Sequence, residues 1–166
     1  EGSRVINVSS NAHKWGKMDF DNLLFEEGKD YSPIKAYSRS KLSNILFTNE
    51  LQRKFEENDI NSIAAAAHPG TSETNLARYL ENKWYFKILY PLVKGMFQDA
   101  AMGALPQIRA SVDPNVKGGD YYGPDGKREI KGYPVKVETS KTSQNISDAK
   151  KLWESSEELT GVRFGL

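Results

Sequence analysis

The 166-residue sequence contains no cysteine and only two histidines, His13 and His68. Without cysteine there can be no disulfide, which suits a reducing compartment, and we expect a cytoplasmic protein. A structural or catalytic zinc ion needs several cysteine or histidine ligands close together. Two histidines that lie far apart in the sequence do not supply such a set, so we expect no metal site.

The sequence also lacks long apolar runs and a strong charge of either sign. No apolar run approaches the roughly 20 residues of a membrane-spanning helix, so we expect no membrane span. The net charge is +1 and the lysines are scattered, which gives no support for a nucleic-acid partner. Hydrophobic residues make up 38% and charged residues 27%, as in soluble globular domains, and residues 1–166 are expected to form a single domain. The chain opens without methionine or a signal peptide and at once enters a predicted strand, an unusual place for a natural start.

The stretch from Ser32 to Glu57 is predicted to form one long helix. Ser32 suits the N-cap, Pro33 suits the first helical position, and Asn58 with Asp59 supplies the stop. Apolar side chains recur at steps of three and four, which gives a broad apolar face for burial on a sheet. These residues are Leu42, Ile45, Leu46, Phe47, Leu51 and Phe55.

Tyr37 and Lys41 lie four residues apart near the start of this helix, and so on one face. A free phenol keeps its proton to about pH 10, but a nearby ammonium stabilises the phenolate. Such a tyrosine can give a proton to a carbonyl oxygen or take one from an alcohol. The spacing alone is weak support, because a tyrosine and a lysine on a helix are usually surface residues. The same spacing recurs at Tyr31/Lys35, Tyr79/Lys83 and Tyr90/Lys94.

Residues 4–8 and 60–67 are predicted to be parallel strands on either side of the long helix. Such strands end at the same edge of a sheet, where ligands bind in open α/β folds. Ser10 follows the first strand, and the turn His68-Pro69-Gly70 follows the second. Each feature has an ordinary interpretation, a loop serine and a plain turn. His13 is interpreted as a solvent-facing loop residue.

The remaining sequence predicts two helices and one strand. Residues 98–112 form an alanine-rich helix, residues 119–123 a short strand, and residues 125–141 a polar loop. The last helix is capped by Ser147 or Asp148 and stops at Gly161. Its predicted buried face consists of Ala149, Leu152, Trp153 and Leu159.

Three stretches in order, RVINVSS (4–10), AYSRSKLSNILFTNEL (36–51) and HPGTSET (68–74), resemble the second half of a short-chain dehydrogenase/reductase. The longer pattern resembles the retinol-dehydrogenase-like branch of that family and covers nearly the whole chain. The resemblance implies an α/β fold, namely the C-terminal portion of a Rossmann-like doubly wound parallel sheet with flanking helices. It also implies an NAD(P)-dependent oxidoreductase that interconverts a carbonyl and an alcohol on an apolar small molecule, with NADP favoured over NAD.

The resemblance assigns roles to individual residues. Tyr37 would be the general acid or base. Lys41 would assist Tyr37 and bind the cofactor ribose, and Ser10 would donate a hydrogen bond to the reacting oxygen of the substrate. The cofactor-binding set is Tyr37, Lys41, His68, Pro69, Gly70, Thr71 and Thr74. The substrate pocket is expected to include Ser10, Asn11, Trp84, Tyr85 and Tyr90, although helix packing is an equal alternative for the aromatic stretch. Many family members pair through the long helix, so a homodimer or higher oligomer is expected.

The sequence departs from the family pattern in two ways. It contains no G-x-G-x-x-G turn for a cofactor pyrophosphate, and the family's Asn-Ala-Gly strand motif is also missing. The alternative hypothesis is therefore an inactive fragment or half-domain that needs a partner chain.

Overall fold

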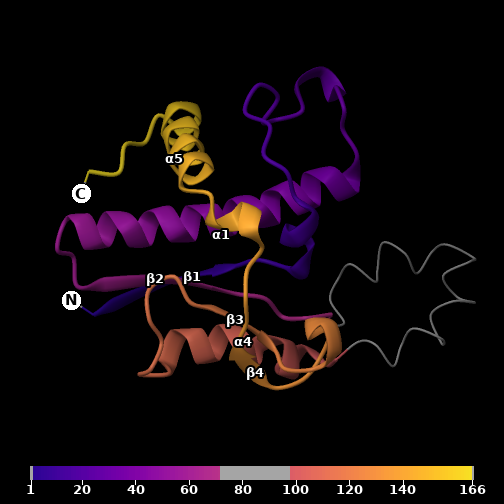
Figure 1. The fold of residues 1–166 in the computed structure, drawn as a ribbon, viewed down its shortest axis with the longest axis vertical. Helices are drawn as coiled ribbons and strands as arrows, with labels where there is room; N and C mark the ends of the chain where they lie inside the picture. Colours follow the sequence, from indigo (N-terminus) through magenta and orange to yellow (C-terminus); the bar gives the residue numbers. More distant parts are fainter. Residues whose placement is uncertain (1, 72–97, 166) are drawn as a thin grey trace, which may run out of the picture.

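The computed structural model describes residues 2–71 and 98–165, and these ranges form a four-stranded sheet in the order β1-β2-β3-β4 (Figure 1). The strands are β1 Ser3–Val8, β2 Ser62–Ala67, β3 Tyr121–Pro124 and β4 Pro134–Lys136. The α-helices are α1 Pro33–Glu57, α4 Ala100–Val112 and α5 Ile146–Thr160. Short 3-10 helices are η1 Asn11–Trp15, η2 Glu26–Gly28, η4 Lys127–Glu129 and η5 Lys141–Gln144.

The first three strands are parallel, as predicted, but the fourth is not. β4 pairs antiparallel with β3, so the sheet is mixed rather than purely parallel. The polar loop predicted for residues 125–141 thus contains a strand. Three residues are too few for a period-two pattern to show in the sequence. The pairing depends on a chain reversal in which the Asp125 N–H donates to the Tyr133 carbonyl at 2.8 Å.

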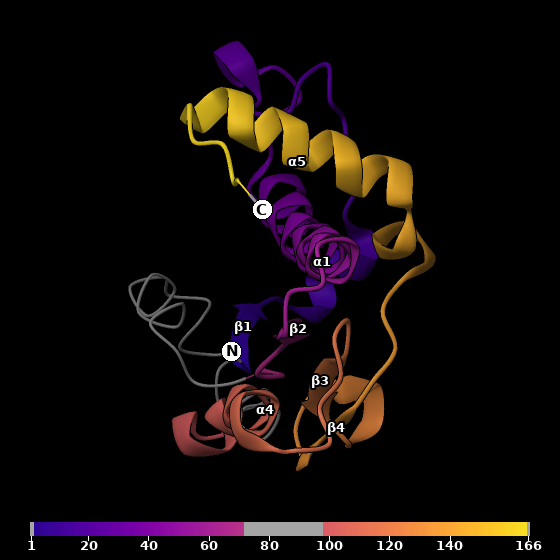
Figure 2. The ribbon, with the colours of Figure 1, turned by 90° about the vertical axis from the view of Figure 1, so that its left-hand side faces the viewer.

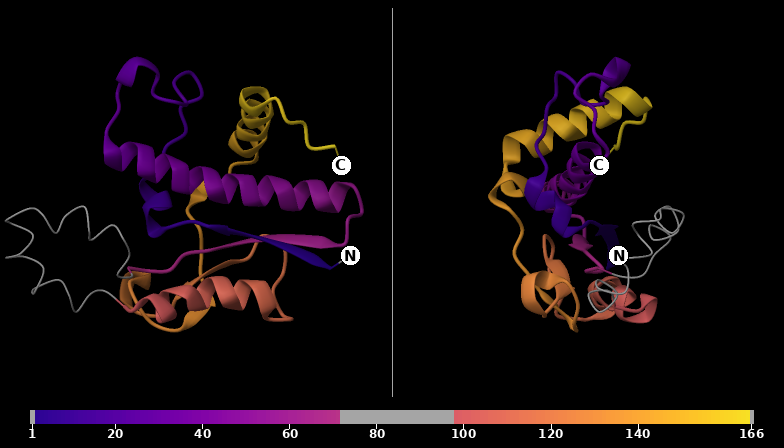
Figure 3. Two further views of the ribbon diagram at one scale, coloured as in Figure 1. Left: turned by 180° about the vertical axis from the view of Figure 1, so that it is seen from behind. Right: turned by 90° about the vertical axis from the view of Figure 1, so that its right-hand side faces the viewer.

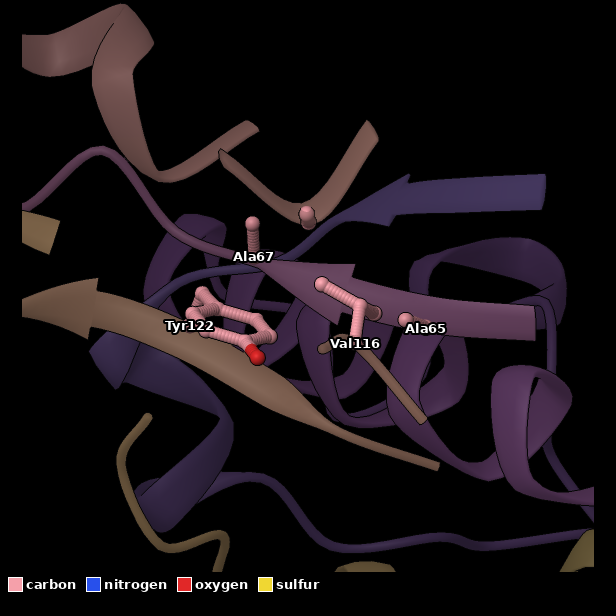
Figure 4. Close-up of a cluster of buried hydrophobic side chains, with 5 residues drawn as sticks. Ala65, Ala67, Val116 and Tyr122 are labelled. Carbon is pink, nitrogen blue, oxygen red and sulfur yellow. The ribbon is translucent and has the colours of Figure 1, made fainter. Parts of the chain in front are cut away.

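Helices cover both faces of the sheet, α1 on one side and α4 on the other (Figures 1 and 2). The central strand β2 reads SIAAAA, and its alternate alanines face opposite helices. Ala64 and Ala66 pack with α1 residues, whereas Ala65 and Ala67 pack with Ala110 of α4. Figure 4 shows the second of these clusters, with Val116 and Tyr122 beside Ala65 and Ala67. Small side chains on both faces let two helices approach one strand closely.

The long helix has the predicted bounds. The Ser32 hydroxyl accepts from the Lys35 N–H at 3.3 Å, Pro33 occupies the first turn and Asn58 caps the end. Its second apolar face is covered within the same chain, because α5 crosses over α1 (Figures 2 and 3). There Leu42 and Leu46 pack against two residues of α5, Ala149 and Leu152.

Two details of the last helix differ from the prediction. Its N-cap is Asn145, whose side chain accepts from the Asp148 N–H at 3.2 Å, rather than Ser147 or Asp148. Leu159 is 56% exposed and does not join the buried face. Trp153 anchors the helix instead: its ring stacks on Phe47 with 5.1 Å between ring centroids. The predicted stop at Gly161 is confirmed, with a left-handed φ of 67°.

Trp153→Ala should lower the free energy of unfolding by about 3–5 kcal/mol, because it empties a buried aromatic site between α1 and α5. Leu159→Ala on the same helix is the matched control and should change it by less than about 0.5 kcal/mol. Urea denaturation followed by circular dichroism measures both values. Equal losses would show that α5 is not anchored through Trp153.

Candidate active site

The ends of β1 and β2 lie side by side. Val8 pairs with Ala67, and the Ser9 N–H donates to the Ala67 carbonyl at 2.8 Å. The two turns that follow these strands therefore start from neighbouring positions at one edge of the sheet. This is the arrangement predicted for Ser10 and for the His68-Pro69-Gly70 turn.

Helix α1 is joined to the same edge by hydrogen bonds. The Ser9 hydroxyl donates to the Lys41 carbonyl at 2.8 Å, and the Asn44 amide donates to the Val8 carbonyl at 2.9 Å. Lys41 Nζ donates to that Val8 carbonyl at 3.4 Å and lies 5.6 Å from the centroid of the Tyr37 ring. Tyr37 is 48% exposed, so its phenol stays accessible beside the strand end.

Ser10 lies at the start of η1, directly after this junction. Its hydroxyl oxygen accepts from the Ala12 N–H at 3.2 Å, and a hydroxyl that accepts can still donate. Residues 11–16 then pack on α1 without a gap. A Cβ built on Gly16 would meet the Ser38 carbonyl oxygen at 2.5 Å and the Leu42 Cβ at 2.8 Å. The structure thus brings the segment of Ser10 against the helical turn between Tyr37 and Lys41.

His13 is fully buried, so its interpretation as a solvent-facing residue is wrong. Its Nε2 accepts from the Ser140 N–H at 3.1 Å. The proton of the neutral ring is therefore on Nδ1, which donates to the Ser10 carbonyl at 2.7 Å. Burial lowers the pKa of His13, although the bond to Ser10 acts in the opposite direction. The contact with Ser140 joins residues that are distant in sequence, so local pattern could not reveal it.

His68 is also fully buried, and both ring nitrogens are engaged within the chain. Nδ1 accepts from the Gly70 N–H at 3.2 Å, so Nε2 carries the proton and donates to Glu129 at 3.0 Å. Burial lowers the pKa of His68 to about 4, against the opposing charge of Glu129. The ring of His68 therefore faces inward and supports the turn, while a contact between this residue and a cofactor stays a prediction.

The turn after β2 contains a glycine in the left-handed backbone conformation, as expected for a Pro-Gly turn. Gly70 has a φ of 66°, and a Cβ there would collide with the carbonyl oxygen of Ile130. The Thr71 N–H donates to the same carbonyl at 2.7 Å, and Gln98 Nε2 donates to the Pro69 carbonyl at 2.7 Å. The backbone of the turn is therefore fixed from two sides.

Sequence reasoning missed the loop at η4. Glu129 contacts His68, and Asn11 Nδ2 donates to the Arg128 carbonyl at 3.1 Å. The Asn11 side chain, predicted to line the substrate pocket, is thus used to hold this loop. No spacing in the sequence links residue 129 to residues 11 and 68. Four predicted site residues lie outside the described ranges, namely Thr74, Trp84, Tyr85 and Tyr90.

Neither a metal-binding cluster nor a membrane-spanning helix is found in the described part of the chain. Across residues 2–71 and 98–165, no group of three or more His, Cys, Asp or Glu side chains is arranged to hold a metal ion. Among the helices of the same ranges, none has both the length and the apolar character that crossing a membrane requires.

The pKa of His68 predicts a pH dependence of stability. The ordinary value is 6.5 and the folded value about 4, so the unfolded chain takes up a proton first as the pH falls. The stability contributed by neutral His68 is complete above about pH 6.5 and is lost as the pH falls to about 4. Between pH 7.5 and 5 the free energy of unfolding should drop by about 2 kcal/mol from this residue. Urea denaturation at both pH values measures the drop, and His68→Asn should show a smaller one; equal drops would contradict the assignment.

Comparison with known proteins gives one consistent result. No family model matches the chain. Human (Homo sapiens) retinol dehydrogenase 14 is 37% identical over 163 residues, 96% of this chain and 45% of that protein. Homo sapiens retinol dehydrogenase 12 is 32% identical over 164 residues, 98% of this chain and 47% of that protein. The WW domain-containing oxidoreductase of Homo sapiens is 31% identical over 173 residues, 98% of this chain and 38% of that protein.

A crystal structure of an uncharacterised protein from Mycobacterium paratuberculosis shares the fold. It has a TM-score of 0.78 and 34% identity, and the match covers 99% of this chain and 53% of that one. The chain thus spans about half the length of the relatives it matches. The motifs at 4–10, 36–51 and 68–74, the fold and these relatives agree: nearly the whole chain is similar to about half of the retinol dehydrogenases, which are short-chain dehydrogenases/reductases.

Proposed function

We propose that the protein to which this chain belongs is a nicotinamide-dependent oxidoreductase that interconverts a carbonyl and an alcohol. The observation that carries the proposal is the meeting of three segments at one edge of the sheet. These are the Ser10 segment after β1, the Tyr37–Lys41 turn of α1 and the Pro69–Gly70 turn after β2. The relatives named above are dehydrogenases and an oxidoreductase, which supports the reaction class.

On this proposal, residues of this chain transfer the proton to or from the substrate oxygen. In the reductive direction the Tyr37 hydroxyl donates its proton to the carbonyl oxygen, and in the oxidative direction the phenolate takes the proton of the alcohol. The Lys41 ammonium, 5.6 Å from the Tyr37 ring centroid, would bind the cofactor ribose. Ser10 would donate a hydrogen bond to the same substrate oxygen. A bound nicotinamide would supply or accept the hydride.

The turn after β2 fits a cofactor. Gly70 has no room for a Cβ on its inner side, and the backbone of Pro69 and Thr71 is fixed by bonds to Gln98 and Ile130. A rigid turn of this kind can present backbone groups to the nicotinamide carboxamide without reorganisation. We favour NADP over NAD, and an apolar substrate enclosed by Trp84, Tyr85 and Tyr90, because the resembling branch has these features.

Tyr37→Phe in the complete protein should remove nearly all turnover while leaving the fold intact, since it removes only the hydroxyl that transfers the proton. Steady-state reduction of an apolar aldehyde, followed by nicotinamide absorbance, measures the change. Tyr31→Phe is the matched control, because Tyr31 is also exposed but precedes α1. Its activity should stay close to that of the unchanged protein. Substantial turnover by Tyr37→Phe would refute the assignment.

A second candidate, an inactive half-domain, is supported by two observations. The sequence has no glycine-rich turn to hold a pyrophosphate. In the described part of the chain β1 lies at the end of the sheet, with Val5 and Val8 37% and 43% exposed, so its outer edge can pair with a further segment or a partner chain. On this proposal the chain alone does not turn over substrate, and the complete protein does.

Calorimetry on the 166-residue chain alone tests this second candidate. NADP and NAD should bind weakly or not at all, because the backbone amides that cradle a pyrophosphate at a helix N-terminus are missing. The complete protein under the same conditions is the control and should bind in the micromolar range. Micromolar binding by the chain alone would contradict the proposal.

The oligomeric state and the cytoplasmic location stay predictions. Because α5 covers the Leu42–Leu46 face of α1 within the chain, a dimer formed through α1 would have to use other positions of that helix. We propose a homodimer, and light scattering that gives a clean monomer at high concentration would contradict it.

A further inference from the structure

Glu129 lies between the two turns that follow β1 and β2. Its Oε2 accepts from His68 Nε2 at 3.0 Å, and its Oε1 accepts from Lys14 Nζ at 2.9 Å. The Glu129 side chain is only 21% exposed, and its contact with His68 is partly buried, whereas its contact with Lys14 is exposed. Lys14 belongs to the segment that begins at Ser10, and His68 begins the turn of Pro69 and Gly70. One carboxylate therefore joins the two segments of the site.

The loop that carries Glu129 has an unfavourable backbone. Arg128 and Glu129 have φ values of 57° and 56°, in the left-handed region that residues with a Cβ rarely adopt. Such conformations persist where surrounding contacts hold them, often at functional sites. Here Asn11 Nδ2 donates to the Arg128 carbonyl at 3.1 Å and to the Glu129 carbonyl at 3.4 Å, and the Glu129 N–H donates to the Gly126 carbonyl at 2.8 Å. The strained loop is thus held directly against the site.

The tautomer of His68 determines whether its ring can accept the hydrogen bond from the Gly70 N–H, which fixes the turn after β2. Nδ1 can accept from the Gly70 N–H only if the ring proton is on Nε2. A carboxylate can only accept, so Glu129 at Nε2 stabilises that tautomer. Without Glu129 the Nε2–H would be a buried donor without its acceptor, which is costly. The ring has no space to move away, because it lies so close to Gly123 that even a Cβ there would collide with Nε2.

The two buried histidines have opposite tautomers. His13 carries its proton on Nδ1 and His68 on Nε2, and both rings pack on Tyr121, with centroids 5.4 Å and 5.2 Å from its ring. His13 holds the carbonyl of Ser10, whereas His68 holds the N–H of Gly70. Of these two rings, that of His68 is hydrogen-bonded to Glu129, so exchange of the Gly70 amide reports the effect of Glu129 on the turn after β2.

We propose that Glu129 is a positioning residue: it holds His68 in the Nε2–H tautomer, so that Nδ1 keeps the Gly70 N–H and fixes the Pro69–Gly70 turn in the shape that receives the nicotinamide. The part about the nicotinamide rests on the proposed function. The part about the tautomer and the turn rests on the contacts alone, and it can be tested without any turnover.

Nitrogen-15 NMR of the protein tests the tautomer. Long-range proton–nitrogen spectra distinguish protonated from unprotonated ring nitrogens, and His68→Asn assigns the His68 signals by removing them. At neutral pH we expect the His68 ring to be protonated on Nε2.

Glu129→Ala should change the chemical shifts of the His68 ring nitrogens. It should also speed hydrogen exchange of the Gly70 amide roughly fivefold, the effect of one neutral hydrogen bond. Glu129→Gln keeps an acceptor oxygen and should preserve both signals. Glu158→Ala, on an exposed α5 residue, is the matched carboxylate control.

A double variant shows whether Glu129 acts through His68. In His68→Asn the amide oxygen can replace Nδ1 as the acceptor of the Gly70 N–H, without any need for Glu129. Glu129→Ala added to His68→Asn should therefore leave Gly70 exchange unchanged. An equal effect of Glu129→Ala in both backgrounds would overturn the proposal. So would unchanged His68 signals and unchanged Gly70 exchange in folded Glu129→Ala.

Kinetics of the complete protein separate this proposal from the proposed function. Glu129→Ala should raise KM for the nicotinamide dinucleotide roughly tenfold and change kcat less, whereas Glu129→Gln should restore KM. If the tautomer and Gly70 exchange respond as expected but KM for the dinucleotide does not, the turn does not receive the nicotinamide and that part of the proposal is overturned. If the complete protein reduces no carbonyl compound with either dinucleotide, the proposed function fails, and the NMR result still decides the role of Glu129.

Discussion

The close packing of two helices on one alanine strand is the constraint on which the structure depends. Ala64 and Ala66 face α1, and Ala65 and Ala67 face α4, with none of the four more than 2% exposed. Any larger side chain on β2 would push one helix away from the sheet, because packed interiors have little free space. The position of α1 relative to β1 follows from this packing, and with it the distance between Lys41 and the end of β1.

A second constraint is the dry, neutral layer behind the turns. His13, His68 and Tyr121 are buried together, and burial disfavours the charged form of each: it lowers the pKa of both histidines and raises that of Tyr121. A neutral imidazole offers one donor and one acceptor, so each ring can bridge two groups with a fixed direction. His13 joins the Ser10 carbonyl to the Ser140 N–H, and His68 joins the Gly70 N–H to the Glu129 carboxylate. The layer thereby orients the segments that carry Ser10 and Gly70, while the charges of Lys14 and Glu129 remain nearer to solvent.

Sequence and structure agree where the signal is local. The bounds of α1, its cap at Ser32, and the strand-turn unit ending in Gly70 all follow from short-range steric and hydrogen-bonding preferences. They differ where a residue's environment comes from distant segments. The local sequence around His13 is that of an ordinary loop, but contacts with Ser140 and Tyr121 bury the residue. Leu159 fits the apolar pattern of α5, but it is exposed in the structure.

The sequence by itself determined the order of helices and parallel strands, because hydrophobic period, caps and glycine turns are local properties. The resemblance of its motifs to a known family indicated the three segments on which the candidate chemistry lies. Only the tertiary structure decided the antiparallel direction of β4, the burial of both histidines and the place of Glu129 between His68 and Lys14. The histidine and Glu129 features depend on contacts between residues far apart in the sequence, such as His68 with Glu129 and His13 with Ser140. No periodicity in the chain encodes such a contact, since it exists only once the sheet and its two helices have packed.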